Sequence, residues 1–410
     1  MFNKVINTLV SIFNEGAYTN IIVSSTINSS NFNDTEKKLY TKLVYGVVEN
    51  KLLIDYHLQP LIKGQRVKPF IKNALRVGVY GFDNLNLAKH YLVDSIVSAV
   101  KKKDYKASTF VNAILRKYQN TPVRELNNLS KIDYLSIKYS LDKDLTNLLY
   151  NQYKEKFETF FENTEETYNT YRINTLKTTK ENIEDYLNKE DIEYTITNEV
   201  ILQTKKSLIN TNLFKDGLIV AQDKSSIMTS IIAAPKENDI ILDSCSAPGS
   251  KSMHLASIIN NKGSITSLDV YDHKIKLIEE NAKKLGVTCI KAYNKDATTV
   301  SFDHKFDVIL ADVPCSGLGV IRHKPDLKYQ MTLEKIESIK KLQNDIVNNV
   351  LQYLKEGGTF VYSTCTINKD ENELFIEKLI KKYPNLKKEE EIITLPTLYE
   401  DGFYICKLRG

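Results

Sequence analysis

The stretch Asp312-Val313-Pro314-Cys315-Ser316-Gly317 directly follows a short apolar run, Phe306 to Leu310. Such a run, closed by turn-forming residues, is typical of a buried strand. Open α/β sheets bind their ligands just beyond the carboxyl ends of strands, so an acid, a proline and a cysteine here indicate a functional loop. Two further loops have the same setting, one at 243–251 and one that ends in Cys365. We predict that the three loops lie together and form one active site.

The last part of the chain, residues 216–410, alternates short apolar runs with segments of helical periodicity. Strands are expected at 239–243, 264–270, 288–292, 306–310, 359–363 and 403–408, and Gly357-Gly358 is expected to turn the chain into the fifth. Helices are expected between them, the longest at 332–354. Strands that alternate with helices predict a doubly wound α/β sheet with helices on both faces.

The first part of the chain, residues 1–130, has helical periodicity instead. Apolar residues recur with the spacing of one helix face at 40–48, 71–79 and 93–100, and a further helix is expected at 110–118. These segments predict a small all-α bundle. Residues 131–215 mix helical segments with short strands at 171–174, 194–196 and 200–202, which predicts a small α+β connector.

Positive charge is concentrated in the N-terminal third. Residues 1–150 contain 21 Lys and Arg against 12 Asp and Glu, a balance of +9, whereas the remaining residues carry −4. Lys101-Lys102-Lys103 and Lys106 lie between two expected helices, where they would suit phosphate contacts. A basic surface of this kind usually marks a nucleic-acid partner, and a solvated surface without a partner is the alternative.

The five cysteines are far apart and form no Cys-x-x-Cys pair, which argues against a disulfide framework and against a zinc site. No metal is therefore expected. Cys289 and Cys406 lie in apolar runs and fit buried core positions. No apolar run reaches the roughly 18 residues of a membrane span, and the N-terminus lacks a signal-peptide pattern. We therefore expect a cytoplasmic protein.

The loop Cys245-Ser246-Ala247-Pro248-Gly249-Ser250-Lys251 contains small residues that let the backbone approach a ligand. Asp269 follows Gly249 by 20 residues, at the end of the next expected strand, where nucleotide-binding folds place an acid against ribose. Asp296 follows the third strand and would face an adenine. The loop has neither the GxGxxG nor the P-loop pattern, which leaves a ligand with one ribose and no pyrophosphate; S-adenosylmethionine fits. For each aspartate the alternative is a helix N-cap.

Two cysteines beside such a cofactor suggest methyl transfer to C5 of a pyrimidine, a carbon that is too weak a nucleophile to react directly. A cysteine thiolate that adds to C6 makes C5 reactive, which is covalent catalysis. Asp312 is placed to stabilise the charge that develops near N3, and it is also a candidate contact of the cofactor. The second cysteine would remove the C5 proton or position the water that does so. The spacing alone does not decide whether Cys315 or Cys365 attacks.

The sequence resembles the RNA cytosine-5 methyltransferases in three motifs, which lie at 245–251, at 312–319, and at 362–366 with Glu371-Asn372-Glu373. The resemblance extends to 222–226 and 401–404. Residues 43–47 and 110–116 resemble the helical RNA-binding domain of the antitermination factor NusB. This combination is similar to the B-type bacterial 16S rRNA cytosine-5 methyltransferases. It implies a Rossmann-like, S-adenosylmethionine-dependent domain preceded by a NusB-like bundle.

The resemblance also implies roles for individual residues. The nucleophile of the family corresponds to Cys365, and the cysteine that assists product release corresponds to Cys315. Its cofactor contacts correspond to residues 245–251 together with Asp269, Asp296 and Asp312. The implied partner is RNA, 16S rRNA in particular, and we expect a monomer.

Two positions depart from the family pattern, because Ser246 and Ser250 stand where an Ala and a Gly are usual. A β-carbon at position 250 would hinder a backbone conformation with positive φ or a close approach of the ligand, and so would weaken cofactor binding. Two alternatives to the rRNA reaction remain open. One is the same reaction on tRNA, and the other is an RNA-binding ribosome assembly factor without catalytic activity.

Overall fold

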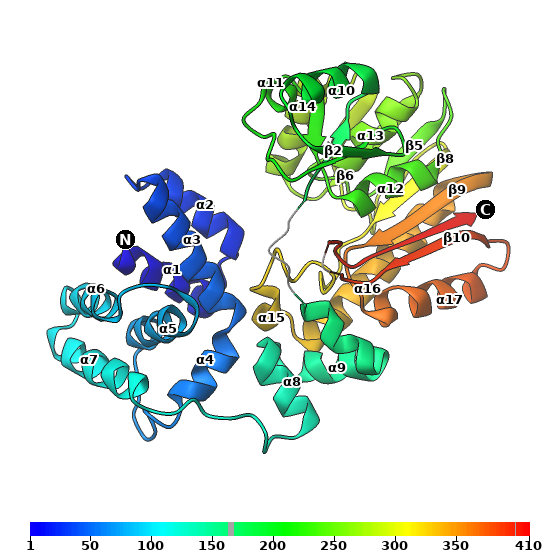
Figure 1. Cartoon of the computed structure of the whole chain (residues 1–410). Helices are drawn as coiled ribbons and strands as arrows, with labels where there is room; N and C mark the ends of the chain where they lie inside the picture. The colour runs from blue at the N-terminus through cyan, green and yellow to red at the C-terminus, as the bar shows by residue number, and fades with distance from the viewer. Residues whose placement is uncertain (163–167, 398) are drawn as a thin grey trace. The chain divides into compact units, whose positions relative to one another are not determined.

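The computed structural model describes residues 1–162, 168–397 and 399–410. They form two compact units (Figure 1). The first unit contains Met1–Phe161 together with Ile321–Leu333, and the second contains Glu162–Val320 and Glu334–Gly410. The first unit is therefore discontinuous in sequence, since it includes a segment that follows the loop of Cys315.

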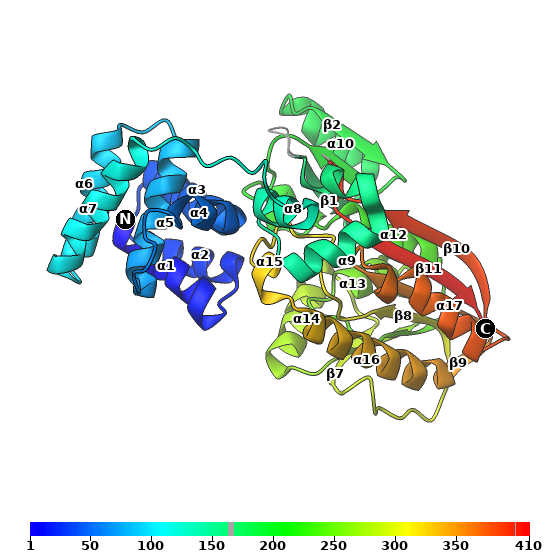
Figure 2. The same cartoon turned by 90° about the horizontal axis from the view of Figure 1, so that it is seen from below.

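The first unit is helical (Figure 2). The apolar helix faces within residues 2–118 bury one shared core. The structure contains the four helices expected near residues 40–48, 71–79, 93–100 and 110–118. It adds helices within residues 2–28 and at 51–58 that the sequence pattern did not single out, although Val5, Ile6 and Leu9 have the spacing of a helix face. The helices are α1 (Phe2–Glu15), α2 (Thr19–Asn28), α3 (Asp34–Glu49), α4 (Lys51–Leu58), α5 (Pro69–Asn84), α6 (Lys89–Lys101), α7 (Tyr105–Gln119), α8 (Lys131–Tyr139), α9 (Lys143–Tyr153), η1 (Lys154–Phe161) and α15 (Leu327–Gln330).

Side chains cap the starts of α3, α7, α8 and α9. The Asn33 side chain accepts a hydrogen bond from the Glu36 amide, and the Glu36 carboxylate accepts one from the Asn33 amide, which makes a capping box at α3. Asp104 caps α7 by accepting from the Ala107 amide. No helix in the described ranges has both the length and the apolar character needed to cross a membrane.

Helix α15 belongs to the first unit by its contacts. The Lys328 ammonium donates to the backbone carbonyls of Glu49, at 3.2 Å, and Tyr139, at 3.0 Å. The Tyr329 hydroxyl donates to the carbonyl of Val48 at 2.7 Å. Burial lowers the pKa of Lys328 to about 8, against the opposing charge of Glu49.

The second unit contains a small antiparallel sheet with the strand order β2-β3-β1-β4. Its strands are β1 (Asn169–Ile173), β2 (Tyr194–Thr197), β3 (Ile201–Thr204) and β4 (Ile219–Ala221), with α10 (Lys180–Lys189) and α11 (Asn212–Lys215). The buried Asn174 amide donates to the carbonyls of Gly217 and Leu285, each at 2.9 Å. This side chain therefore joins the small sheet to the larger one.

The larger sheet has seven strands in the order β10-β11-β9-β8-β5-β6-β7. The strands are β5 (Ile240–Asp243), β6 (Ser264–Asp269), β7 (Ile290–Asn294), β8 (Phe306–Asp312), β9 (Leu354–Thr364), β10 (Lys387–Thr394) and β11 (Phe403–Arg409). Strands β5 to β9 run in parallel, and β11 is antiparallel to both of its neighbours.

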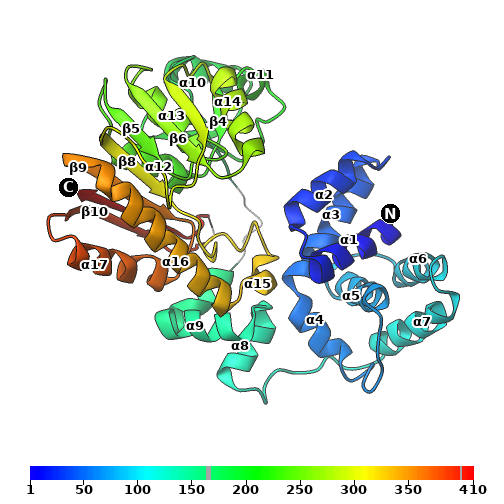
Figure 3. The same cartoon turned by 180° about the vertical axis from the view of Figure 1, so that it is seen from behind.

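Helices cover both faces of this sheet (Figure 3). Core residues of α12 (Lys224–Ala233), α13 (Ser250–Ile258) and α14 (Asp272–Leu285) pack on one face. Those of α16 (Leu333–Val350) and α17 (Glu373–Lys382) pack on the other, near the short turns η2 (Leu351–Tyr353) and η3 (Lys369–Glu371). The predicted doubly wound α/β fold is confirmed.

Two details of the sheet differ from the sequence-based expectation. Gly357 and Gly358 lie inside β9, not before it, because the strand begins at Leu354. Gly357 has a φ of +68°, and the pairing of β9 with β8 changes register there. Strand β10 was not expected, because its first half is a run of charged residues. Charged side chains are common on an edge strand, where they discourage pairing with other chains.

The predicted division at residues 130 and 215 does not coincide with the limits of the two compact units. Residues 131–161 belong to the first unit, and the small sheet belongs to the second. That the three predicted domains (1–130, 131–215 and 216–410) fold separately stays a prediction.

Candidate active site

The carboxyl ends of three neighbouring strands bring the three predicted loops together. Strands β5, β8 and β9 are adjacent and parallel. Asp243 pairs with Leu310 between β5 and β8, and Asp312 pairs with Ser363 between β8 and β9. The next strand in the chain, β6, lies on the other side of β5, so the strand order reverses here. Such a reversal is where open α/β sheets bind ligands.

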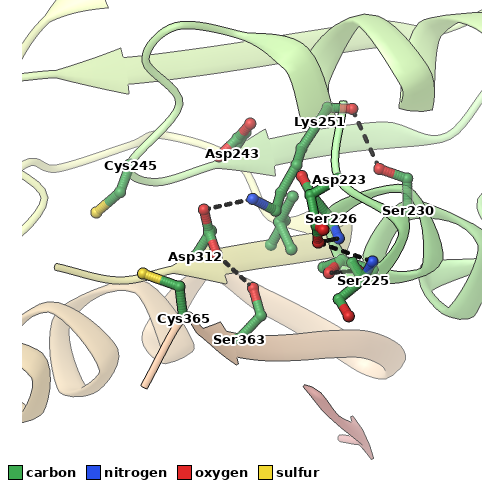
Figure 4. Close-up of polar contacts among 12 residues, drawn as sticks. Asp223, Ser225, Ser226, Ser230, Asp243, Cys245, Lys251, Asp312, Ser363 and Cys365 are labelled. Atoms are coloured by element: carbon green, nitrogen blue, oxygen red, sulfur yellow. Dashed lines mark hydrogen bonds and ion pairs between the residues drawn. The ribbon is translucent and has the colours of Figure 1, made fainter. Parts of the chain in front are cut away.

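An ion pair joins the first loop to the second (Figure 4). The Lys251 ammonium, from α13, lies 2.6 Å from the Asp312 carboxylate at the end of β8. The other oxygen of Asp312 accepts a hydrogen bond from the Ser363 hydroxyl at 2.7 Å. Burial by itself would lower the pKa of Lys251, but the charge of Asp312 and its hydrogen bond outweigh burial and raise that pKa. Lys251 is therefore a protonated group whose side chain is only 12% exposed.

The two predicted catalytic cysteines lie in contact. Their Sγ atoms are 3.3 Å apart, although they are separated by 50 residues in sequence. The pKa of the Cys315 thiol is raised well above its usual range, first by the hydrogen bond with Cys365 and then by burial. A raised pKa means that Cys315 holds its proton more tightly than an ordinary cysteine does.

The first loop has the compact form expected of a cofactor loop. Its backbone is held by hydrogen bonds from Ser246 to the Leu268 carbonyl, at 2.8 Å, and from Gly249 to the Ser246 carbonyl, at 2.6 Å. Gly249 has a φ of +95°, and Ser250 begins α13 without a positive φ. The glycine conformation that we expected at position 250 is therefore at 249, and Ser250 introduces no backbone strain.

The two aspartates that follow β6 and β7 make local hydrogen bonds. Asp269 accepts from the Tyr271 amide at 3.1 Å and lies 3.4 Å from the Lys274 ammonium. Asp296 is exposed and accepts from both the amide and the hydroxyl of Thr298. Neither aspartate is the helix N-cap named as the alternative, because Tyr271 is the N-cap of α14 and a turn follows Asp296. Their contact with a cofactor stays a prediction.

Sequence reasoning missed two polar groups beside the loops. One is Ser363, whose hydroxyl orients Asp312; a serine two residues before a cysteine gives no signal of this contact. The other is Asp223, which caps α12 by accepting from the amides of Ser225 and Ser226 (Figure 4). Burial, and then the charge of Asp401, raise the pKa of Asp223. The motif at 222–226 was noted, but it carried no predicted role.

The loop fits a ligand that donates hydrogen bonds. Asp243, at the end of β5, is buried, and burial raises its pKa to about 6. One of its oxygens accepts from Ser252, while the other, Oδ1, has no hydrogen-bond partner. A buried acceptor without a partner is costly, and a bound donor would relieve that cost. At Gly249, a β-carbon would approach Met253 to 3.0 Å, so the small residue keeps this turn open.

Comparisons with known proteins now bear on this geometry. A family model described as 16S rRNA methyltransferase RsmB/F matches residues 230–409, and a model of the NusB family matches residues 3–120. A probable ribosomal RNA small subunit methyltransferase B of Bacillus subtilis (strain 168) is 32% identical over 440 residues, covering 98% of this chain and 97% of that protein. The chain belongs to the RsmB/F family of 16S rRNA methyltransferases.

This RsmB/F family member is an RNA methyltransferase that depends on S-adenosylmethionine, as the resemblance implied. A tRNA (cytosine(72)-C(5))-methyltransferase of Pyrococcus horikoshii is 34% identical over 217 residues, covering 50% of this chain and 55% of that protein. The solved structure of PH0851 has a TM-score of 0.84 at 23% identity and covers 100% of this chain and 99% of its own, which supports the fold. A methyltransferase homolog from Pyrococcus horikoshii has a TM-score of 0.59 at 25% identity, covering 68% and 99%.

Proposed function

We propose that this protein methylates C5 of a cytosine in 16S rRNA through a transient bond between Cys365 Sγ and C6 of the base. The observation that carries the proposal is the contact between the two cysteine sulfurs at the ligand-binding edge of the sheet. Two thiols in contact suit a reaction in which one forms a covalent bond and the other handles a proton.

The two cysteines divide the work. The Cys365 thiolate would add to C6, and the electrons of the 5,6 double bond would make C5 a nucleophile. Bound S-adenosylmethionine would supply the methyl group for C5, and its sulfur would leave as a neutral thioether. Afterwards the C5 proton leaves to a base, the double bond re-forms, and Cys365 departs as a thiolate. Cys315 holds its proton more tightly than an ordinary cysteine does, and it takes part in the release step.

The ion pair of Lys251 and Asp312 is placed to stabilise charge on the cytosine ring during the reaction. Addition of sulfur at C6 places negative charge on the ring near N3 and O2. A buried ammonium, held in place by Asp312, stabilises such charge without reorganisation at the moment of reaction. Asp312 in turn is oriented by Ser363.

S-adenosylmethionine supplies an electrophilic methyl group when it is bound. Residues 245–251 and Asp312 would hold it at the ends of β5 and β8, Asp269 would hold its ribose, and Asp296 would lie by the adenine. The free acceptor Oδ1 of Asp243 adds one more polar group at the same edge.

The choice of 16S rRNA over tRNA follows from coverage. The Bacillus relative named for the small ribosomal subunit matches along almost the whole chain, whereas the Pyrococcus relative named for tRNA matches over half of it. We also propose that the protein acts as a monomer in the cytoplasm. Sedimentation would test the oligomeric state, and fractionation of cells that contain the tagged protein would test the location.

The test is methyl transfer from labelled S-adenosylmethionine to RNA made without modification. We expect label in 16S rRNA, at one cytosine, and none in tRNA. Label in tRNA alone would replace the rRNA proposal by the tRNA reaction. Absence of label from both RNAs, with the RNA bound, would favour an assembly factor without catalysis.

A further inference from the structure

A buried carboxylate, Glu371, lies between the two cysteine loops and plays no part in the mechanism above. It belongs to η3 and is fully buried. Its Oε2 accepts from the Ser316 amide at 2.9 Å and from the Gln343 side chain at 3.0 Å. Its Oε1 accepts from the Ser316 hydroxyl at 2.5 Å and from the Asn368 side chain at 3.0 Å. Four neutral donors surround it, which matches an ionised carboxylate.

These hydrogen bonds hold both neighbours of Cys315. On one side, Ser316 gives its amide and its hydroxyl to Glu371. On the other side, the Pro314 carbonyl accepts at 2.9 Å from the Gln343 amide, which also binds Glu371. The loop that carries Cys315 is therefore fixed before and after the thiol by groups that meet at one carboxylate.

Glu371 is also tied to the segment of Cys365, through its backbone carbonyl and through Ser316. The Tyr362 hydroxyl, from β9, donates to the Glu371 carbonyl at 2.7 Å. The Thr366 hydroxyl, next to Cys365, lies 2.7 Å from the Ser316 hydroxyl. Glu371 thus adds a connection close to the two sulfurs, beyond the pairing of β8 with β9 and the hydrogen bond from the Gly319 amide to the Cys365 carbonyl. A weak S–H hydrogen bond alone does not order two loops.

We propose that Glu371 is a positioning residue that holds Cys315 in register with Cys365 for the release step of methyl transfer. This inference rests on the proposed function of the two cysteines. In the wild-type protein, the fixed thiol meets the Cys365–C6 adduct in the geometry needed for its breakdown. Without the carboxylate, the Cys315 loop loses its anchor while Cys365 and the cofactor loop remain. The adduct then forms and persists.

The test substitutes Glu371→Gln, which keeps size and shape but puts an NH₂ group among four donors. Turnover on unmodified 16S rRNA should fall about tenfold or more, the usual cost of losing hydrogen bonds to a buried charged group. The protein–RNA adduct should accumulate as a slower band in a denaturing gel, as expected for Cys315→Ala. In the Cys315→Ala background, Glu371→Gln should add nothing to the adduct, because both changes act through the same thiol.

Two further variants make the outcome decisive. Ser316→Ala removes one donor of Glu371 with little risk to folding, and it should show a weaker form of the same adduct accumulation. Glu391→Gln is the matched control, because Glu391 also accepts hydrogen bonds from side chains, those of Tyr404 and Lys388, but lies on β10. The turnover and the adduct level of this variant should equal those of the wild-type protein.

The inference is overturned if Glu371→Gln turns over RNA at the wild-type rate and accumulates no extra adduct. If Glu371→Gln does not fold, the same result for Ser316→Ala overturns it. It is also overturned if turnover falls only in proportion to the loss of folded protein, measured by melting and by cofactor binding. Failure of the proposed function would look different, because the wild-type protein would then methylate no RNA and Cys315→Ala would trap none.

Discussion

Cys315 and Cys365 have the same side chain and lie with their Sγ atoms 3.3 Å apart. The pKa of Cys315 is raised well above its usual range, first by the hydrogen bond with Cys365 and then by burial. A thiol that holds its proton tightly suits the residue that acts after addition to the base. The resemblance to RNA cytosine-5 methyltransferases implied the same assignment.

The first prediction separates the two cysteines. Cys365→Ala should abolish methyl transfer, because no bond to C6 can form. Cys315→Ala should stop turnover while it accumulates a covalent protein–RNA complex, visible as a band of reduced mobility under denaturing conditions. A gel in which Cys365→Ala traps RNA and Cys315→Ala does not would exchange the two roles.

The second prediction concerns pH and Asp243. Its pKa is raised to about 6 by burial, above the value of an unfolded aspartate near 3.8, so the folded state binds the extra proton between these values. Stability from this group is present below about pH 4 and is lost as pH rises through 6, by up to about 3 kcal/mol. Asp243→Asn should therefore flatten the change in melting temperature between pH 4 and 6. Asp303→Asn, at an exposed position, is the control. If the melting temperature of Asp243→Asn changes with pH as that of the wild-type protein does, the prediction is wrong.

At the scale of elements, three segments meet where the active-site loops close. The Gly319 amide donates to the Cys365 carbonyl at 3.1 Å, and the Gly402 amide donates to the Gly319 carbonyl at 2.8 Å. Gly319 follows the Cys315 loop, and Gly402 immediately precedes β11. Their backbones approach so closely that a β-carbon on Gly319 would lie 2.1 Å from the Gly402 oxygen.

The third prediction follows from this close approach. Gly319→Ala should destabilise the second unit by about 2–3 kcal/mol, since backbone atoms cannot move aside as a flexible side chain does. The loops of Cys315 and Cys365 should also be displaced, so activity should fall further than stability. Chemical denaturation and methyl transfer measure the two effects. Gly357→Ala, where a β-carbon meets no atom within 4 Å, is a control for space, although its positive φ adds some strain.

At the scale of the whole molecule, the discontinuous first unit has a consequence for dissection. Residues 321–333 pack with the N-terminal helices, and Lys328 and Tyr329 give their polar groups to carbonyls at residues 48, 49 and 139. A fragment that begins at residue 162 would expose this segment without its partners.

The fourth prediction therefore compares two fragments. A fragment of residues 162–410 should be poorly soluble, because it leaves apolar and polar groups of the 321–333 segment unpaired. The same fragment with residues 321–333 replaced by a Gly/Ser linker of equal length should be more soluble and bind cofactor. Expression yield, gel filtration and cofactor titration test this. Equal solubility of the two fragments would argue against a packing role of the segment.

The sequence determined the parts whose signal is local. Apolar runs followed by Gly, Pro, Cys and Asp identified the three loops, and alternation of strands with helices predicted the sheet that joins them. Helix periodicity identified α3, α5, α6 and α7. These signals are readable because each depends on residues within a few positions of one another.

Only the tertiary structure decided the features that depend on distant residues. Glu371 receives hydrogen bonds from Gln343 and Ser316, 28 and 55 positions away, and Lys328 binds a carbonyl 279 positions away. Strand β10 is a charged run that becomes a strand because β11 offers an open edge. In each case a burial or pairing partner, not a local propensity, sets the conformation, and no window of sequence contains both partners.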